Sequence, residues 1–399
     1  MPSPRLILTL LAATVLAGVS PALAQAAKTP RVDITVGETI RDGKKQRARM
    51  TVTADRGGYR GFIGIEERGN AGPEIGKRSY SFETRARDGD NRSVELLGLP
   101  RENDFVLEAV HTDETYMRNA LAYRTARRLD RWGPRTDFVE IWLNGRYRGL
   151  YVLTEQVKLD ENRMDIDRRG LSGGYLLELT DGDVEGDITG PVSGRPYEHK
   201  DPETSDLGGE EEDYIADFLG RTEQALAVDD SSWQAFFDVD AAVDYVLLNE
   251  LFKNNDHFSR SVFLAKGWKQ GFVLGPTWDF DRSMGDEHLA ERGGPQGWVT
   301  PGKHIGTTLL RDPVFVEKLI TRWRERRDER GLYGDLMKTV DGYARELRWA
   351  QIRDSRLWRK EGEPEHDAAV RDLRTWLAAR ITWIDANIEG LRAGARPPA

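Results

Sequence analysis

Alternating apolar and polar positions mark much of the first half of the chain. A period of two predicts strands, and it recurs in five segments, residues 32–36, 48–53, 138–143, 147–153 and 174–179. The first pair flanks Asp42-Gly43 and the second pair flanks Asn144-Gly145. These dipeptides tolerate the positive φ angles of tight hairpin turns. We therefore predict two β-hairpins and one further strand in this half.

Helical periodicity first occurs at residues 116–130 and becomes dominant after residue 210. The other predicted helices cover residues 210–228, 240–252 and most of 313–391. Two short strands are predicted between them, at 261–265 and 271–274, and a Gly- and Pro-rich mobile loop at 286–308. Strands first and helices later are typical of an α+β fold with segregated layers. Such a fold permits two lobes with a ligand cleft between them.

These patterns divide the chain into predicted segments. A β-hairpin segment covers residues 25–59, a β-rich N-terminal lobe covers 60–180, and a mainly helical C-terminal lobe covers 214–391. Residues 181–213, between the lobes, are acidic and rich in glycine, and charge repulsion disfavours packing, so we predict a long loop there. Residues 392–399 are predicted to be a disordered tail.

Residues 1–24 predict a cleaved secretory signal. Arg5 precedes an apolar run at residues 6–19, and Ala22-Leu23-Ala24 supplies the small residues of a cleavage site. The run is shorter than the ~20 residues that a membrane-spanning helix needs. We therefore expect cleavage after Ala24, a secreted or periplasmic location, and no stable membrane span in the mature protein.

Charge and cysteine content argue against several classes of function. The 399 residues include 67 acidic and 58 basic side chains, for a formal net charge of -9. This charge disfavours general nucleic-acid binding, because it repels phosphates. The absence of cysteine excludes disulfides, thiolate metal sites and cysteine nucleophiles. The chain also lacks the motifs of His-Glu-x-x-His metalloproteases, Gly-x-Ser-x-Gly hydrolases and phosphate-loop enzymes.

The densest group of chemically useful residues runs from residue 254 to residue 285. Asp256 and Asp279 flank the two predicted short strands, and a hairpin would bring their carboxylates together. Mg²⁺ and Mn²⁺ accept such oxygen ligands, with phosphates supplying the rest. Asp281, two residues further on, is a second candidate ligand. The spacing leaves another interpretation open, in which these aspartates cap turns and helices.

Basic residues that could bind phosphate lie in the β-rich half. They are Arg68 and the adjacent pair Lys77-Arg78. Neighbouring side chains on a strand point to opposite faces, so one of the pair could face a cleft, although most such pairs are solvated surface. Glu155 follows the Asn-Gly hairpin. It could orient a phosphate-binding cation or form an ordinary surface ion pair.

Several motifs in a fixed order resemble the CotH family, the spore-coat protein H group of atypical secreted protein kinases. The resemblance covers about residues 60–290, and the ordered set is more specific than any single block. The blocks are Arg68-Gly69-Asn70, Lys77-Arg78-Ser79-Tyr80, Met117-Arg118-Asn119, the Leu-Asn-Gly-x-Tyr-x-Gly-Leu-Tyr pattern from Leu143 to Tyr151, Asn255-Asp256, and Trp278-Asp279-Phe280-Asp281.

This resemblance implies a diverged, two-lobed kinase-like fold. It implies that ATP binds with Mg²⁺ or Mn²⁺ and that the γ-phosphate passes to a hydroxyl of an extracytoplasmic protein. By position, Asp256 resembles the catalytic acid, and Asp279 and Asp281 resemble the metal ligands. The implied nucleotide-binding residues are Arg68, Lys77, Arg78 and Glu155.

Two positions depart from the kinase pattern. Ser261 stands five residues after Asp256, where kinase catalytic loops carry a metal-binding asparagine, and Asn255 is a possible substitute as a metal ligand. Arg78 replaces the second lysine of the family's Lys-Lys pair, and arginine is bulkier and forked. These departures leave a second class of function open, a catalytically weak or inactive cell-envelope binding module on the same fold.

Overall fold

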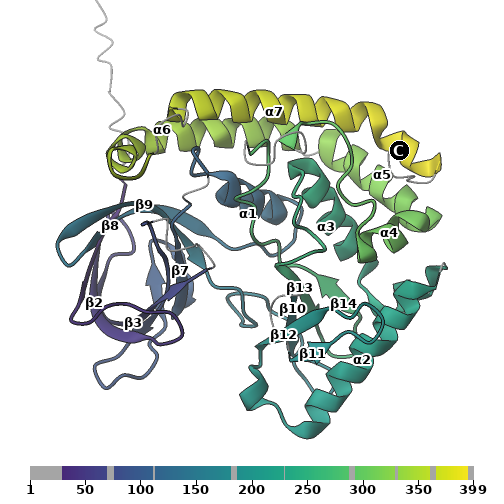
Figure 1. Cartoon of the computed structure of the whole chain (residues 1–399), viewed down its shortest axis with the longest axis horizontal. Helices are drawn as coiled ribbons and strands as arrows, with labels where there is room; N and C mark the ends of the chain where they lie inside the picture. Colours follow the sequence, from purple (N-terminus) through teal and green to yellow (C-terminus); the bar gives the residue numbers. More distant parts are fainter. Residues whose placement is uncertain are drawn as a thin grey trace, which may run out of the picture.

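Seven strands of the N-terminal region close into a barrel (Figure 1). The computed structural model describes residues 29–69, 76–110, 113–180, 187–228, 230–286, 293–328, 331–359 and 365–393. The predicted signal at residues 1–24 lies outside these ranges. In barrel order the strands are β1 (Arg31–Val36), β2 (Gln46–Thr53), β3 (Tyr59–Arg68), β4 (Ser79–Arg85), β7 (Asp104–Glu108), β9 (Arg146–Glu155) and β8 (Thr136–Leu143).

The barrel confirms both predicted hairpins. β1 pairs with β2 in antiparallel register, with Val32 opposite Val52, and β8 pairs with β9 across the Asn144-Gly145 turn. Their alternate apolar side chains fill the barrel core. Closure comes from a parallel pairing of β1 with β8. Residues 25–59 are therefore not a separate hairpin segment, because β1 and β2 are integral barrel strands. A small hairpin of β5 (Val94–Leu96) and β6 (Leu99–Glu102) lies between β4 and β7 in the chain.

A second, five-stranded antiparallel sheet follows the barrel. Its order is β11 (Ile188–Thr189), β12 (Pro196–Asp201), β10 (Tyr175–Leu179), β13 (Val262–Lys266) and β14 (Phe272–Leu274). The predicted strand at 174–179 is thus confirmed as β10, but it belongs to this sheet and not to the β-rich N-terminal lobe.

The prediction of a long loop over residues 181–213 is wrong for most of its described part. This part contains β11, β12, a 3₁₀ helix η1 (Thr204–Asp206) and the start of α2 (Gly209–Ala227). β12 pairs with both β10 and β11, and its Tyr197 is buried. The acidic side chains indicate only that one face of this segment is solvated. They do not prevent the backbone from completing a sheet.

The C-terminal region is mainly helical, as predicted. Its helices after α2 are α3 (Val239–Phe252), α4 (His304–Arg311), α5 (Pro313–Asp328), α6 (Leu332–Trp358) and α7 (His366–Asn387), with 3₁₀ helices η2 (Ser231–Phe236) and η4 (Ile388–Ala393). The predicted helix at 116–130 is α1 (Arg118–Arg128), between β7 and β8. α3 is buried along almost its whole length and forms the centre of the larger core. Of the predicted tail, residues 392 and 393 belong to η4 and the rest lies outside the described ranges.

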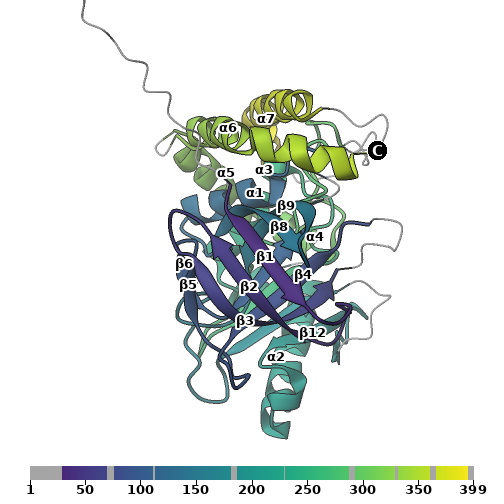
Figure 2. The same ribbon diagram turned by 90° about the vertical axis from the view of Figure 1, so that its left-hand side faces the viewer.

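α6 and α7 lie side by side across one end of the molecule (Figures 1 and 2). The C-terminal part of α6 packs on β9 of the barrel, and α7 packs on α3. None of the helices in the described ranges is both long and apolar enough to cross a membrane. The protein therefore has a mixed α+β architecture, with a strand-rich N-terminal region joined to a helical C-terminal region.

Candidate functional site

The β13–β14 hairpin brings the two predicted aspartate segments together. Leu264 pairs with Leu274, and the Gly275 amide donates to the Phe263 carbonyl oxygen at 3.0 Å. Beyond the paired strands, the Ser261 hydroxyl donates to Asp279 Oδ2 at 3.2 Å. The Asn254 amide also donates to the carbonyl oxygen of Asp279 at 3.2 Å. The predicted meeting of the hairpin ends is therefore confirmed.

Four carboxylates lie close enough to influence one another at this point, and we call them the acid cluster: Glu108, Asp256, Asp279 and Asp281. Burial, with the charges of Asp281, Glu108 and Asp256, raises the pKa of Asp279 to about 8. Burial also raises the pKa of Glu108 to about 7, and the charge of Asp281 adds to this rise. Carboxylates that repel one another in this way favour a shared proton or a bound cation.

Asp279 also holds an unusual backbone conformation. Its φ angle is +63°, in the left-handed region that non-glycine residues rarely adopt. Its amide donates to the Tyr123 hydroxyl at 3.4 Å. Strain of this kind persists where surrounding contacts enforce it, and it is concentrated at functional sites.

Asn119 connects the acid cluster across two parts of the fold. Its side-chain amide donates to Glu108 Oε2 at 2.9 Å, and its Oδ1 accepts from the Phe280 amide at 2.7 Å. Asn119 lies in the first turn of α1, where the buried Asp113 carboxylate accepts from the Arg118 amide at 2.8 Å and from its guanidinium at 2.6 Å. The start of α1 thus fixes the distance between barrel strand β7 and the 278–281 segment.

Glu108 and Asn119 were not among the site residues that sequence reasoning identified. Asn119 belongs to the Met117-Arg118-Asn119 block, so the sequence showed the motif but not the role of this residue. Glu108 is the last residue of the apolar strand β7. A carboxylate in an otherwise apolar strand was the sequence signal that could have identified this site residue.

An aromatic pair and one arginine border the acid cluster. Trp278 stacks on Tyr123 with ring centroids 5.5 Å apart, and the Arg68 guanidinium lies 5.7 Å from the Trp278 ring. The positive charge of Arg68 acts to lower the pKa of Glu108, against the effect of burial. Arg68, the last residue of β3, therefore lies beside the acid cluster, and its role in nucleotide binding stays a prediction.

The loop at residues 254–261 carries Asp256 at a partly exposed position. The Asp256 amide donates to Asn254 Oδ1 at 3.1 Å, and its carboxylate lies 4.0 Å from Arg260. Asn255 donates its side-chain amide to the Lys253 carbonyl oxygen at 3.2 Å. That bond leaves Asn255 Oδ1 as its atom suited to a cation.

His257, next to Asp256, stabilises this loop from the protein interior. It is buried, with Nδ1 2.6 Å from the Asn254 carbonyl oxygen and Nε2 3.1 Å from Thr300 Oγ1. Burial lowers the pKa of His257 to about 3. The imidazole is therefore neutral at physiological pH and serves as a structural contact.

The structure does not place Lys77 at the acid cluster, contrary to its expected role as a phosphate clamp. Lys77 is 1% exposed, and its ammonium donates to Asp354 Oδ1 and to the Leu150 carbonyl oxygen, both at 2.7 Å. Asp354 also accepts from the Leu150 amide and the Tyr116 hydroxyl. This buried ion pair joins the barrel to α6 and keeps Lys77 from solvent. Of the Lys77-Arg78 pair, only Arg78 is partly exposed.

Glu155 likewise has a structural position and does not orient the predicted clamp. Its carboxylate is fully buried and accepts from Arg163 at 2.8 Å and from Arg135 at 3.0 Å. These two arginines bind the end of β9 to the segments before and after it. The alternative of an exposed surface ion pair is also wrong, because Glu155 and Arg163 are both inaccessible to solvent.

The donor set fits a divalent cation that also binds phosphate. Within the described ranges, no group of three or more His, Asp or Glu side chains is arranged to hold a metal ion alone. Mg²⁺ usually takes one or two carboxylates and completes its shell with water and substrate phosphates. Asp279 and Asp281 supply such a pair, and neutralising their repulsion favours a cation.

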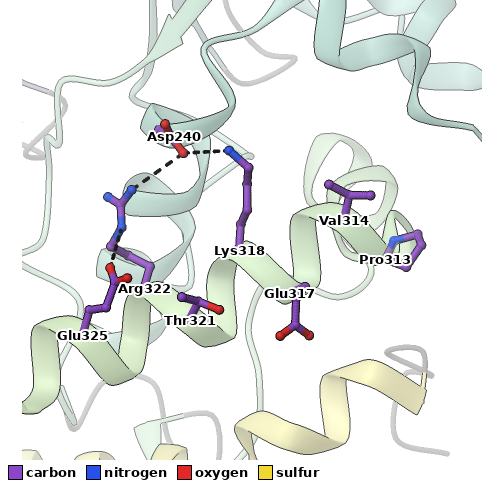
Figure 3. A pocket seen from close by; sticks show the side chains of 8 residues that line it. All are labelled: Asp240, Pro313, Val314, Glu317, Lys318, Thr321, Arg322 and Glu325. Atoms are coloured by element: carbon purple, nitrogen blue, oxygen red, sulfur yellow. Dashed lines mark hydrogen bonds and ion pairs between the residues drawn. The ribbon is translucent and has the colours of Figure 1, made fainter.

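An open groove of about 480 Å³ elsewhere on the molecule has different chemistry (Figure 3). It lies along α5 and the start of α3, and it shares no residue with the acid cluster. Asp240 lies 3.0 Å from Lys318 and 3.7 Å from Arg322. These charges neutralise one another, so the groove has no strong preference for an ionic ligand.

Comparison with known proteins identifies the family. The family model described as CotH kinase protein matches residues 65–384, which is most of the chain and contains every residue of the acid cluster. No significant match was found among the curated proteins. The extent of the family match shows that the chain belongs to the CotH kinase protein family.

Proposed function

We propose that this protein is a metal-dependent protein kinase that transfers the γ-phosphate of ATP to a protein hydroxyl. The observation that carries the proposal is the convergence of Asp279, Asp281, Asp256 and Glu108 at the Ser261–Asp279 contact, beside Arg68. Phosphoryl transfer needs a metal, a positive group on the phosphates and an aligned nucleophile, and little covalent chemistry from the protein.

Each residue has a role in this proposal. Asp279 and Asp281 would hold Mg²⁺ or Mn²⁺, which would neutralise charge on the β- and γ-phosphates of ATP. Asp256 accepts the proton of the acceptor hydroxyl while the new oxygen–phosphorus bond forms and the bond to the β–γ bridging oxygen breaks. Arg68 binds phosphate at the rim, with the partly exposed Arg78 as a second candidate. Asn119 and Glu108 position the metal-binding segment.

The acceptor is proposed to be an extracytoplasmic protein, and not a nucleic acid. Two sequence features support this: the predicted signal at residues 1–24 and the net charge of -9. The mature protein would then meet its substrate in the periplasm or outside the cell.

Thermal melting of the mature chain with ATP, with and without Mn²⁺ or Mg²⁺, tests the nucleotide site. We expect a metal-dependent rise in melting temperature. Asp279→Asn should abolish it, whereas Asp256→Asn should retain it and lose only phosphate transfer to a generic protein acceptor. Asp240→Asn, in the groove of Figure 3, is the control and should change neither readout.

The second candidate function is a binding module without transfer activity. The position of Lys77 favours this candidate, because the lysine expected to bind phosphate is instead buried in an ion pair with Asp354. In that case the wild-type protein would show no metal-dependent shift at millimolar ATP.

A further inference from the structure

We propose that the solvent-facing side of α6 docks the protein onto an anionic membrane surface. This α6 face consists of exposed residues that lie on one side of the helix: Lys338, Arg345, Arg348, Trp349, Arg356 and Leu357. α6 runs along the outside of the molecule, across the end shared by the barrel and the helical region (Figures 1 and 2). The inference is independent of the proposed kinase activity.

The α6 face concentrates positive charge on an acidic protein. Lys338, Arg345, Arg348 and Arg356 form no ion pair with any residue that the structure describes. Of the neighbouring acids, Asp341 pairs with Arg374, Asp354 points inward to Lys77, and Glu346 lies toward Asp137 and Arg56. With a net charge of -9 overall, such a face orients the molecule toward an anionic surface.

Two apolar side chains accompany these cations. Trp349 is 60% exposed and Leu357 is 51% exposed, and both rank among the few large hydrophobic residues that face solvent in the described chain. The Arg348 guanidinium lies 5.6 Å from the Trp349 ring. Tryptophan beside arginine is typical of helices that lie in the plane of a membrane interface.

The shape of the face favours a lipid surface over a single acidic peptide. The cations from Lys338 to Arg356 follow one side of α6 over about five helical turns. A row of this length can contact several lipid headgroups at once. Each cation near an anionic leaflet strengthens attraction, and the sum falls with added salt.

The start of the described chain lies on the same side. The Pro30 carbonyl oxygen accepts from the Glu140 amide at 2.9 Å, and the Glu140 carboxylate accepts from Arg353 of α6 at 2.8 and 2.6 Å. The described chain therefore begins beside α6.

Vesicle flotation of the mature chain tests the proposal. We expect wild-type protein to float with phosphatidylcholine vesicles that contain about 30% phosphatidylglycerol, in a salt-sensitive manner, and not with pure phosphatidylcholine. The triple variant Arg345→Glu/Arg348→Glu/Arg356→Glu should bind at least about a hundredfold more weakly. Trp349→Ala should weaken the binding that persists at high salt, because apolar insertion is not screened.

The control is a triple reversal of the same net charge in the strand-rich N-terminal region, Arg49→Glu/Arg60→Glu/Arg101→Glu, whose residues are all exposed. It should float like the wild type, and unchanged melting temperatures should show that each variant folds. Failure of the wild type to float, or equal loss in both triple variants, would overturn the proposal. Retention of the wild type on polyglutamate but not on vesicles would also overturn it, because the face would then serve an acidic protein.

Discussion

At the residue scale, ionisation of the acid cluster lowers the stability of the metal-free protein. Folding raises the pKa of Asp279 to about 8, from an ordinary value near 4. The folded state therefore binds the proton more tightly than the unfolded state. The stability from this group is fully present below about pH 4 and is lost as the pH rises through about 8.

We predict that Asp279→Asn stabilises the metal-free protein at alkaline pH. The gain should be on the order of 2 kcal/mol at about pH 9, less than the full shift implies because the neighbouring carboxylates take part in the same titration. It should largely vanish at about pH 3, where wild-type Asp279 is mostly protonated in both states. Urea unfolding with a chelator measures this difference, and a gain independent of pH would contradict the assignment. Added Mn²⁺ should stabilise only the wild type.

Asn119→Ala is expected to weaken metal-dependent nucleotide binding without any direct contact to the metal. The variant removes both hydrogen bonds that hold Glu108 and the Phe280 amide. Loss of such a supporting residue typically costs about tenfold to a hundredfold in metal affinity. The measurement is the Mn²⁺ concentration that gives half of the ATP-dependent melting shift.

Thr125→Ala is the matched control for Asn119, since it is buried on the same helix and its hydroxyl bonds only to the Leu121 carbonyl oxygen in the described structure. It should lower stability while leaving the half-saturating Mn²⁺ concentration unchanged. The same increase in both variants would show that Asn119 acts only through overall stability.

At the element scale, the contact between α6 and the barrel explains the position of Lys77. Asp354 reaches from α6 to the Leu150 amide on β9, and Trp358 donates to the Arg148 carbonyl oxygen at 2.9 Å. Gly149 lies at the contact with a φ angle of +109°, and a Cβ atom there would meet Asp354 Oδ1 at 2.0 Å. Only glycine allows this close approach of helix and strand.

Lys77→Met is predicted to destabilise the protein by about 3–5 kcal/mol, because Asp354 would remain buried and unpaired. The double variant Lys77→Met/Asp354→Asn should recover much of this loss, since both groups are then neutral. It should also retain the metal-dependent ATP shift in melting temperature. If instead the stable double variant lost that shift, Lys77 would be a nucleotide ligand after all.

At the scale of the whole molecule, distant helices hold the loop that supports Asp256. The Arg380 guanidinium, from α7, donates to the Pro295 and Gly297 carbonyl oxygens and to Glu250 of α3. The Glu250 carboxylate in turn accepts from the Val299 and Thr300 amides. Thr300 contacts His257, so α3 and α7 together brace residues 254–261.

Arg380→Met should therefore loosen both loops, and the buried Glu250 left behind should cost about 3–5 kcal/mol of stability. Hydrogen exchange should quicken at the amides of residues 294–300 and 254–261 before it changes elsewhere. Arg392→Met, which removes exposed ion pairs with Glu317 and Glu389, is the control. Unaltered protection of residues 294–300 in Arg380→Met would contradict the bracing role.

Much of the fold and part of the site could be predicted from local patterns. Strands, hairpin turns and most helices agree with the structure, and the resemblance to the CotH family is confirmed. The hairpin that brings the two aspartate segments together could be predicted because its two strands are close in sequence. Glu108 was missed because an inward strand position is expected to be apolar, and its carboxylate is held by Asn119 from another element.

The sequence by itself determined the period of each element, the positions of tight turns and the family motifs, because these depend on neighbours within a few residues. Only the tertiary structure decided that β1 closes a barrel against β8, that β11 and β12 complete a second sheet, and that Lys77 and Glu155 are structural. Each of these outcomes depends on a partner far along the chain. A charged side chain becomes either a ligand-binding group or a buried ion pair according to that partner, and for Lys77 the partner is Asp354, 277 positions away.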